Sequence, residues 1–127
     1  MNTRRILLGF LAVTPTLFTT GAFAADYTPA AFEAAQKAGK PILVHITAPW
    51  CTTCAAQKPI LAKLEADPKF KELQVFDVDV DSRKDVVKQF GATMQSTLIT
   101  YKGTKETGRS VGETKPEVIA SLLDKAI

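Results

Sequence analysis

The sequence predicts an α/β domain built on a central mixed β-sheet that is flanked by helices, and three patterns carry this prediction. The unbroken apolar run at 41–47 is typical of a central strand covered on both faces. Residues 73–80 alternate between the two faces of a second strand, with Phe76 on one side and Asp77 on the other. Two further segments, 97–102 and 106–111, form an antiparallel hairpin. The parallel core and the hairpin together make the sheet mixed.

Two helices are expected in the first half of the domain. The first begins at Pro29, where Thr28 supplies a hydroxyl cap, and it ends at Gly39. The second is expected over 51–66, because the Asp67-Pro68 pair is a stop signal. Its core-facing residues are expected to be Ile60, Leu61 and Leu64.

Two capping boxes predict the helices of the second half. Ser82-Arg83-Lys84-Asp85 precedes a helix that runs through Phe90. Thr114-Lys115-Pro116-Glu117 precedes the last helix. The apolar stripe of that last helix consists of Val118, Ile119, Leu122 and Leu123.

The first 24 residues have the pattern of a cleavable secretory signal. Arg4-Arg5 precede an apolar stretch over 6–23, and Ala22-Phe23-Ala24 offers a small-residue cleavage site. Glycine, proline and threonines interrupt the stretch, which favours a signal over the alternative of a membrane anchor. The paired arginines also resemble a twin-arginine export signal, which leaves the export route open. We therefore expect a signal peptide over 1–24, a periplasmic location, and one domain over 25–127.

Charge and composition give no sign of a nucleic-acid partner. The formal net charge of +3 falls to +1 once the two arginines of the signal are removed. No basic run and no interleaving of aromatic and basic residues is present. The chain is expected to be a monomer, although its sequence has no feature that sets the oligomeric state.

The chemistry of the chain is expected at Trp50-Cys51-Thr52-Thr53-Cys54. The chain has two cysteines, and both are in this segment. They follow a buried strand and open a helix, so the sulfur of Cys51 meets the unpaired N–H groups of the helix N-terminus, which favour its thiolate. Cys54 lies one turn further on, close enough to form a disulfide and to expel a bound partner. This arrangement predicts a redox-active dithiol.

The cysteine pair has other interpretations. A structural disulfide stabilises most when it closes a long loop, and this loop is about as short as a disulfide allows. A zinc site needs four ligands, whereas the chain offers two cysteines and His45. A metal ion or an iron–sulfur cluster would therefore have to be shared between two chains. The alternative function is accordingly a binding module, which holds such a cluster or retains a partner as a mixed disulfide. For the redox function no cofactor is expected beyond the disulfide itself.

The segment around the cysteines resembles the thioredoxin family. Pro59 lies five residues beyond Cys54, where the family carries a proline that kinks the active-site helix. Further matches in the family's order and spacing are Phe90-Gly91, Thr97-Leu98-Ile99, Lys102-Gly103 and Val111-Gly112. The resemblance implies the thioredoxin fold and thiol–disulfide exchange with protein thiols and disulfides. It further implies that Cys51 attacks, that Cys54 resolves, and that a membrane thiol transporter supplies electrons. It leaves the direction of electron flow open.

Two departures from the family lie at and beside the cysteines. Thr52-Thr53 stands where reducing thioredoxins have Gly-Pro, and Ser96 stands where the family has a cis-proline facing the cysteines. With Gln95 and Thr97, Ser96 is expected to shape the groove for substrate. The Gln95–Ser96 peptide is expected to be trans, because a cis bond before serine costs about 2.5–4 kcal/mol. Two interpretations of serine at this position are open. The Ser96 hydroxyl could hydrogen-bond the Cys51 thiolate, or the replacement of proline by serine has little effect. Proline at 96 is expected to alter turnover more than stability.

A third departure lies beneath the cysteines. His45 occupies the position of the family's buried acid, and Asp77 occupies that of its nearby lysine. On neighbouring strands the two side chains are expected to be within hydrogen-bond reach, directly or through one water. A neutral imidazole could then carry a proton from Cys54 during resolution. The alternative is a hydrogen-bonded core histidine with a purely structural role. Trp50 is expected to support the site beside Cys51.

Overall fold

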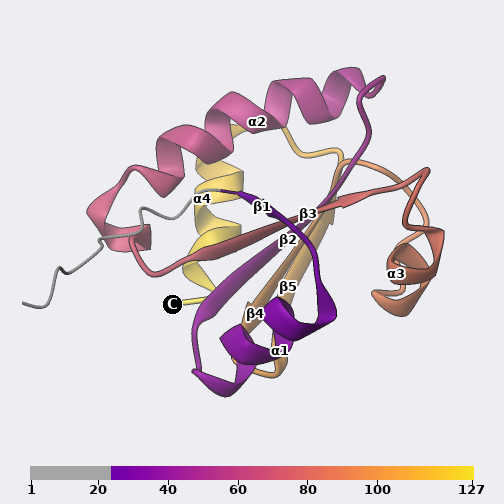
Figure 1. The fold of residues 1–127 in the computed structure, drawn as a ribbon. Helices are drawn as coiled ribbons and strands as arrows, with labels where there is room; N and C mark the ends of the chain where they lie inside the picture. Colours follow the sequence, from indigo (N-terminus) through magenta and orange to yellow (C-terminus); the bar gives the residue numbers. More distant parts are fainter. Residues whose placement is uncertain (1–23) are drawn as a thin grey trace, which may run out of the picture.

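A five-stranded mixed sheet between two layers of helices forms the core of the protein. The computed structural model describes residues 24–127, so most of the predicted signal, residues 1–23, lies outside the described part. The elements, in chain order, are β1 (Ala25–Asp26), α1 (Pro29–Lys37), β2 (Pro41–Thr47), α2 (Thr52–Glu65), the 3-10 helix η1 (Pro68–Phe70), β3 (Gln74–Asp79), α3 (Lys84–Gln89), β4 (Thr97–Lys102), β5 (Lys105–Val111) and α4 (Pro116–Asp124). Helices α1 and α3 cover one face of the sheet, and α2 and α4 cover the other (Figure 1). The predicted α/β architecture is confirmed.

The sheet places β2 at its centre. The strand order is β1-β3-β2-β4-β5. β1 and β2 both pair with β3 in parallel, whereas β4 is antiparallel to β2 and to β5. Strands β2 and β4 have the predicted bounds, and β5 begins one residue earlier than expected. The two-residue β1 was not predicted, because so short a segment has no periodicity to detect.

Alternation along the strands separates two apolar cores. Ile42, Val44 and Ile46 of β2 face α1 and α3, where they join a cluster of edge-to-face aromatic rings. The rings of that cluster are Tyr27, Phe32, Phe76, Phe90 and Tyr101.

The opposite face of β2 carries Leu43 and His45 toward the side of the sheet that α2 and α4 cover. Leu43 packs there against Leu61 of α2 and Ile119 of α4. His45 is therefore a buried polar residue on a face whose other contacts include this apolar core. Of the expected apolar stripe of α4, Val118 is the exception, since it is exposed.

Neither predicted capping box forms. Helices α3 and α4 begin after Arg83 and Lys115, and neither receives a side-chain cap. Carboxylates earlier in the chain bond the loop amides instead. Asp79 accepts the backbone N–H groups of Asp81 and Ser82, at 2.9 and 2.8 Å. Glu113 accepts those of Thr114 and Lys115 at 3.0 and 2.8 Å.

The loop after β3 therefore depends on one ionised carboxylate. The hydrogen bonds of Asp79, chiefly that from the Ser82 backbone N–H, hold its pKa below the ordinary aspartate value. A carboxylate with a lowered pKa stabilises the folded state above its ordinary pKa, and this stabilisation is lost as the pH falls through the folded-state pKa.

Asp79→Ala is expected to lower the free energy of unfolding at neutral pH, with a deficit that shrinks in acid. Urea unfolding from pH 7 to below pH 3.8, the ordinary value for aspartate, would measure the deficit. Asp85→Ala removes the same charge from α3 and serves as the control. A deficit that is independent of pH, or equal in both variants, would contradict the role given to this loop.

Candidate active site

The two cysteines form a disulfide at the N-terminus of α2, shortly after the end of β2. Cys51 is the N-cap of α2, with extended backbone, and its Sγ accepts the backbone N–H of Cys54 at 3.1 Å. This is the position where free helical N–H groups stabilise a thiolate. Cys51 keeps 5% of its surface exposed, whereas Cys54 has none. An incoming sulfur therefore reaches Cys51 first.

Helix α2 holds Cys54 against the sheet through one continuous face. Cys54, Gln57 and Leu61 are its buried residues, and their spacing of three and then four residues follows the helix period. Pro59 lies inside the helix, as the resemblance implied. Ile60 and Leu64 are partly buried beside Leu61, close to what the sequence predicted.

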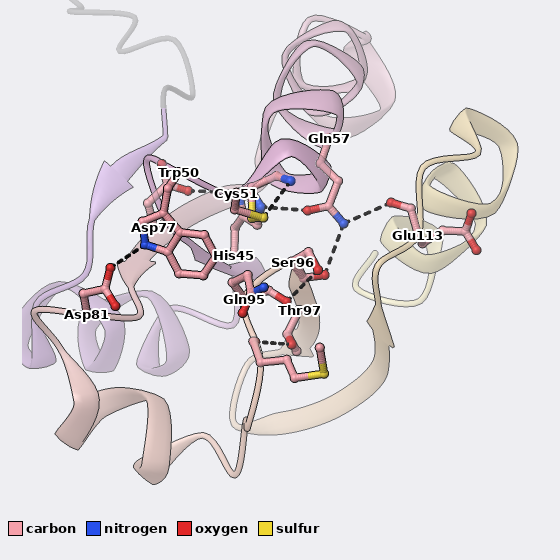
Figure 2. Close-up of a disulfide and its surroundings, with 12 residues drawn as sticks. His45, Trp50, Cys51, Gln57, Asp77, Asp81, Gln95, Ser96, Thr97 and Glu113 are labelled. Atoms are coloured by element: carbon pink, nitrogen blue, oxygen red, sulfur yellow. Dashed lines mark hydrogen bonds and ion pairs between the residues drawn. A yellow bond between two sulfur atoms is a disulfide. The ribbon is translucent and has the colours of Figure 1, made fainter.

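Trp50 stands exposed beside the disulfide and is fixed by one hydrogen bond. Its side chain is 60% exposed, and Nε1 donates to Oδ2 of Asp81 at 2.7 Å. Asp81, in the loop after β3, was not singled out from the sequence, because its partner is 31 residues away. The bond orients the indole ring next to Cys51 (Figure 2).

A surface hollow of about 480 Å³ lies beside the tryptophan. Trp50 and Gln95 line it together with residues of α3, including Lys84 and Lys88. Of the three predicted groove residues, Gln95 lines this hollow, whereas Ser96 and Thr97 are buried and do not. The hollow thus combines an apolar surface at the indole with charges of both signs, because Asp81 lines it as well as the two lysines.

Ser96 adopts an unusual backbone conformation. The described residues contain no cis peptide bond, so the Gln95–Ser96 bond is trans, as expected. The φ angle of Ser96 is positive, at 59°, and this conformation is strained for a residue with a side chain. The hydroxyl donates to the carbonyl of Gln95, so in this disulfide form it is engaged away from the sulfurs. Thr97 steadies the same loop by donating to the Met94 carbonyl at 2.7 Å.

His45 and Asp77 are neighbours, as their strand positions predicted. The two residues are register partners on β2 and β3, and His45 Nδ1 lies 3.4 Å from Asp77 Oδ1. The imidazole is almost fully buried, and the Asp77 side chain is 28% exposed. The second ring nitrogen, Nε2, lies 3.0 Å from Oε1 of Gln57. Both ring nitrogens therefore face these two partners, and a proton can pass between His45 and Cys54 only if one contact is broken.

Gln57, like Asp81, is a residue of the site that the sequence analysis missed. It is fully buried, and its Nε2 donates to the carbonyls of Ser96 and Glu113 at 3.2 and 3.0 Å. With the contact to His45, one amide joins α2, β2 and two loops (Figure 2). Its spacing of three residues from Cys54 was the available signal, since that spacing places both side chains on one helix face.

A second hollow, of about 260 Å³, opens beneath the histidine. Its lining includes His45, Lys58, Glu65 and Asp77. Burial raises the pKa of Glu65, the negative charge of Asp77 raises it further, and His45 acts in the opposite direction. The floor of the site is thus a small cluster of charged residues around this hollow.

Among residues 24–127, no group of three or more His, Cys, Asp or Glu side chains is placed to hold a metal ion. None of the helices there has the length and apolar character needed to cross a membrane.

Comparisons with known proteins match this geometry. The family model described as Thioredoxin matches residues 24–125. A thioredoxin from Alicyclobacillus acidocaldarius is 32% identical over 98 residues, which cover 76% of this chain and 92% of that protein. A thioredoxin H-type from Fagopyrum esculentum is 33% identical over 91 residues, 72% of this chain and 77% of its own length.

A solved structure extends the match to three dimensions. The crystal structure of Trxlp from Edwardsiella tarda superposes with a TM-score of 0.75 and is 42% identical in sequence. The alignment covers 77% of this chain and 95% of that one.

The backbone of Ser96 changes what is expected of a proline there. Proline fixes φ near −65°, which is incompatible with the observed 59°. Ser96→Pro is therefore expected to lower the free energy of unfolding by more than about 1 kcal/mol and to alter turnover at the same time. Ser96→Gly, which accepts a positive φ, is the matched control and is expected to stay within about 1 kcal/mol of the wild type. Urea unfolding and insulin reduction would measure both quantities. Equal stability of the two variants would contradict this account.

Proposed function

This chain belongs to the thioredoxin family, and we propose that it is an exported member that exchanges electrons with protein thiols and disulfides. Thiol–disulfide oxidoreductase activity follows from the family and from the Cys51–Cys54 disulfide. One observation carries the assignment of roles. Cys51 caps α2 and is the more exposed sulfur, whereas Cys54 is completely buried.

The exchange proceeds through a mixed disulfide. In the reduced protein the Cys51 thiolate attacks one sulfur of a substrate disulfide, and the other substrate sulfur leaves as a thiolate. Cys54 then loses its proton and attacks Cys51 Sγ, which expels the second substrate thiolate. Two electrons have passed from the protein to the substrate, and the Cys51–Cys54 disulfide has formed. The same steps in reverse donate a disulfide to a dithiol substrate.

The surroundings of Cys51 support protein substrates. The indole of Trp50 and the hollow beside it offer an extended surface to a polypeptide near the reacting sulfur. Lys84 and Lys88 line that hollow, and they favour acidic side chains close to the substrate cysteine.

The first 24 residues support export. Arg4-Arg5, the apolar stretch and Ala22-Phe23-Ala24 have the order of a cleavable signal. In a periplasmic location a cytosolic reductase cannot reach the disulfide, so the electrons for a reducing function would come from a membrane thiol transporter. The chain acts as a monomer in this proposal.

Cys54→Ala is expected to accumulate a mixed disulfide between Cys51 and substrate, because the resolving thiol is missing. Cys51→Ala is expected to accumulate none, since the remaining thiol is buried. Non-reducing electrophoresis and mass spectrometry after incubation with a disulfide-bonded protein would detect the adducts. Alkylation of the reduced wild type near neutral pH is expected to label Cys51 first. Preferential labelling of Cys54 would overturn the assignment.

Expression of the full chain in a Gram-negative bacterium tests export. The protein is expected in the periplasmic fraction with Ala25 as its first residue, as mass spectrometry of the purified protein would show. A chain that starts at Ala25 behind an added methionine is the control and is expected to remain in the cytoplasm. Full-length protein retained in the membrane fraction would instead indicate an anchor. Replacing Arg4-Arg5 by lysines would separate the two export routes, because only the twin-arginine route requires the arginine pair.

A further inference from the structure

The partners of Gln57 fix the orientation of its side-chain amide. Two of them, the carbonyls of Ser96 and Glu113, lie 3.2 and 3.0 Å from Nε2. A carbonyl can only accept a hydrogen bond, so the NH₂ group must face these two. The amide oxygen Oε1 is then the atom that meets His45 Nε2, at 3.0 Å.

This orientation determines where the protons of His45 lie. Oε1 of Gln57 can only accept, so Nε2 of the imidazole must carry a hydrogen. The other nitrogen, Nδ1, lies 3.4 Å from a carboxylate oxygen of Asp77. A lone pair on Nδ1 would face the negative charge of Asp77 without a proton between them. The contact between Nδ1 and the Asp77 carboxylate is favourable only when a proton lies between them. Imidazole is a stronger base in water than a carboxylate, so this proton belongs to the ring.

The remaining neighbours are compatible with a charged ring. Asp77 approaches from β3, while Lys58 and Glu65 approach from α2 through the hollow that they share with His45. On the β4 side, the register partner of His45 is the apolar Leu98. Of the acids that line the hollow, Asp77 is the one paired with the ring, since its Oδ1 lies 3.4 Å from Nδ1. A buried cation requires polar partners, and the ring has one on each nitrogen: Gln57 Oε1 lies at hydrogen-bond distance from Nε2, and a carboxylate oxygen of Asp77 lies 3.4 Å from Nδ1 as an ion-pair partner.

We propose that Gln57 and Asp77 are positioning residues that hold His45 as an imidazolium beneath the disulfide, and that its charge makes Cys51–Cys54 a stronger oxidant. This inference rests on the proposed exchange activity and concerns its direction. Cys54 and Gln57 lie one helical turn apart on the buried face of α2, so the Nε2 side of the ring is the side nearer to Cys54. Asp77 lies on the far side, toward the hollow.

The charge acts on the sulfur that leaves. When a thiolate of a dithiol substrate attacks Cys51 Sγ, the Cys51–Cys54 bond breaks and Cys54 departs as a thiolate. The second substrate thiol loses its proton to water and displaces Cys51, so two electrons enter the cysteine pair and the substrate disulfide forms. His45 keeps both protons and stabilises the thiolates by its charge, and Cys54 later takes a proton from water. The reduced pair is thereby favoured over the disulfide.

Nitrogen NMR tests the protonation state directly, because His45 is the single histidine of the chain. In the wild type at pH 7, both ring nitrogens are expected to give the signal of a protonated nitrogen. Asp77→Asn replaces the carboxylate by an amide that can donate to Nδ1, so the ring is expected to become neutral with its proton on Nε2. Asp77→Glu keeps a carboxylate and is expected to restore the imidazolium. Asp124→Asn removes an acid from α4 and is the charge-matched control.

Equilibration with glutathione tests the redox consequence. His45→Gln removes the charge, and it is expected to shift the equilibrium about tenfold toward the disulfide, equivalent to about 30 mV for this two-electron couple. Asp77→Asn is expected to shift it in the same direction but less, because the carboxylate is lost as well. Asp124→Asn is expected to leave it unchanged. If Asp77→Asn does not fold, the wild-type spectrum together with His45→Gln still decides the question.

Each outcome is informative. A neutral imidazole in the wild type at pH 7 would overturn the inference, and so would an equilibrium that His45→Gln leaves unchanged. An imidazolium that persists in Asp77→Asn would overturn the role of Asp77. A wild type that fails to exchange with glutathione and with protein disulfides would refute the proposed function instead, so the two failures can be told apart.

Discussion

The side-chain amide of Gln57 is the contact on which the rest of the site depends. Its oxygen meets the ring of His45, and its nitrogen bonds the carbonyls of Ser96 and Glu113. Each of these groups is buried or partly buried, so each would lose a hydrogen bond that water does not replace. The helix that carries Cys54, the central strand and the loop that contains Ser96 are thus held in one arrangement. A shift of α2 along the sheet would break all three contacts at once.

The sheet provides the frame for this arrangement. Because β2 and β3 are parallel and in register, His45 and Asp77 emerge side by side on the face that α2 covers. The antiparallel β4 brings Ser96, the residue before its first, to the end of the sheet where β2 delivers the cysteines. Three segments that are distant in the sequence therefore meet below one disulfide. No loop has to be long, since the strands themselves set the positions.

Most features that depend on neighbouring residues were predictable from the sequence, and most contacts between distant residues were not. The contact of His45 with Asp77 is the exception, because it follows from the positions of the two residues on adjacent strands. The bounds of β2 and β4 follow from local apolar patterns. The spacing of Cys51 and Cys54 predicts a redox-active dithiol without any knowledge of distant residues. Both capping boxes failed because two carboxylates earlier in the chain, Asp79 at the end of β3 and Glu113 in the loop after β5, bond the amides instead. Gln57 escaped notice because its partners lie 12, 39 and 56 residues away. The local sequence of the helix shows only that Gln57 is a residue with good helix propensity.

The departures from the family at positions 45 and 96 are physically linked through Gln57. A buried acid at position 45 would present acceptors where the amide oxygen of Gln57 is also an acceptor, whereas an imidazole N–H satisfies that oxygen. The amide nitrogen then bonds the Ser96 carbonyl, in a loop whose positive φ excludes a proline in the same conformation. His45→Asp alone would therefore create an unpaired contact, and its cost would depend on the residue at 57. Substitutions at 45, 57 and 96 act on one hydrogen-bonded unit, and their energies are not expected to add.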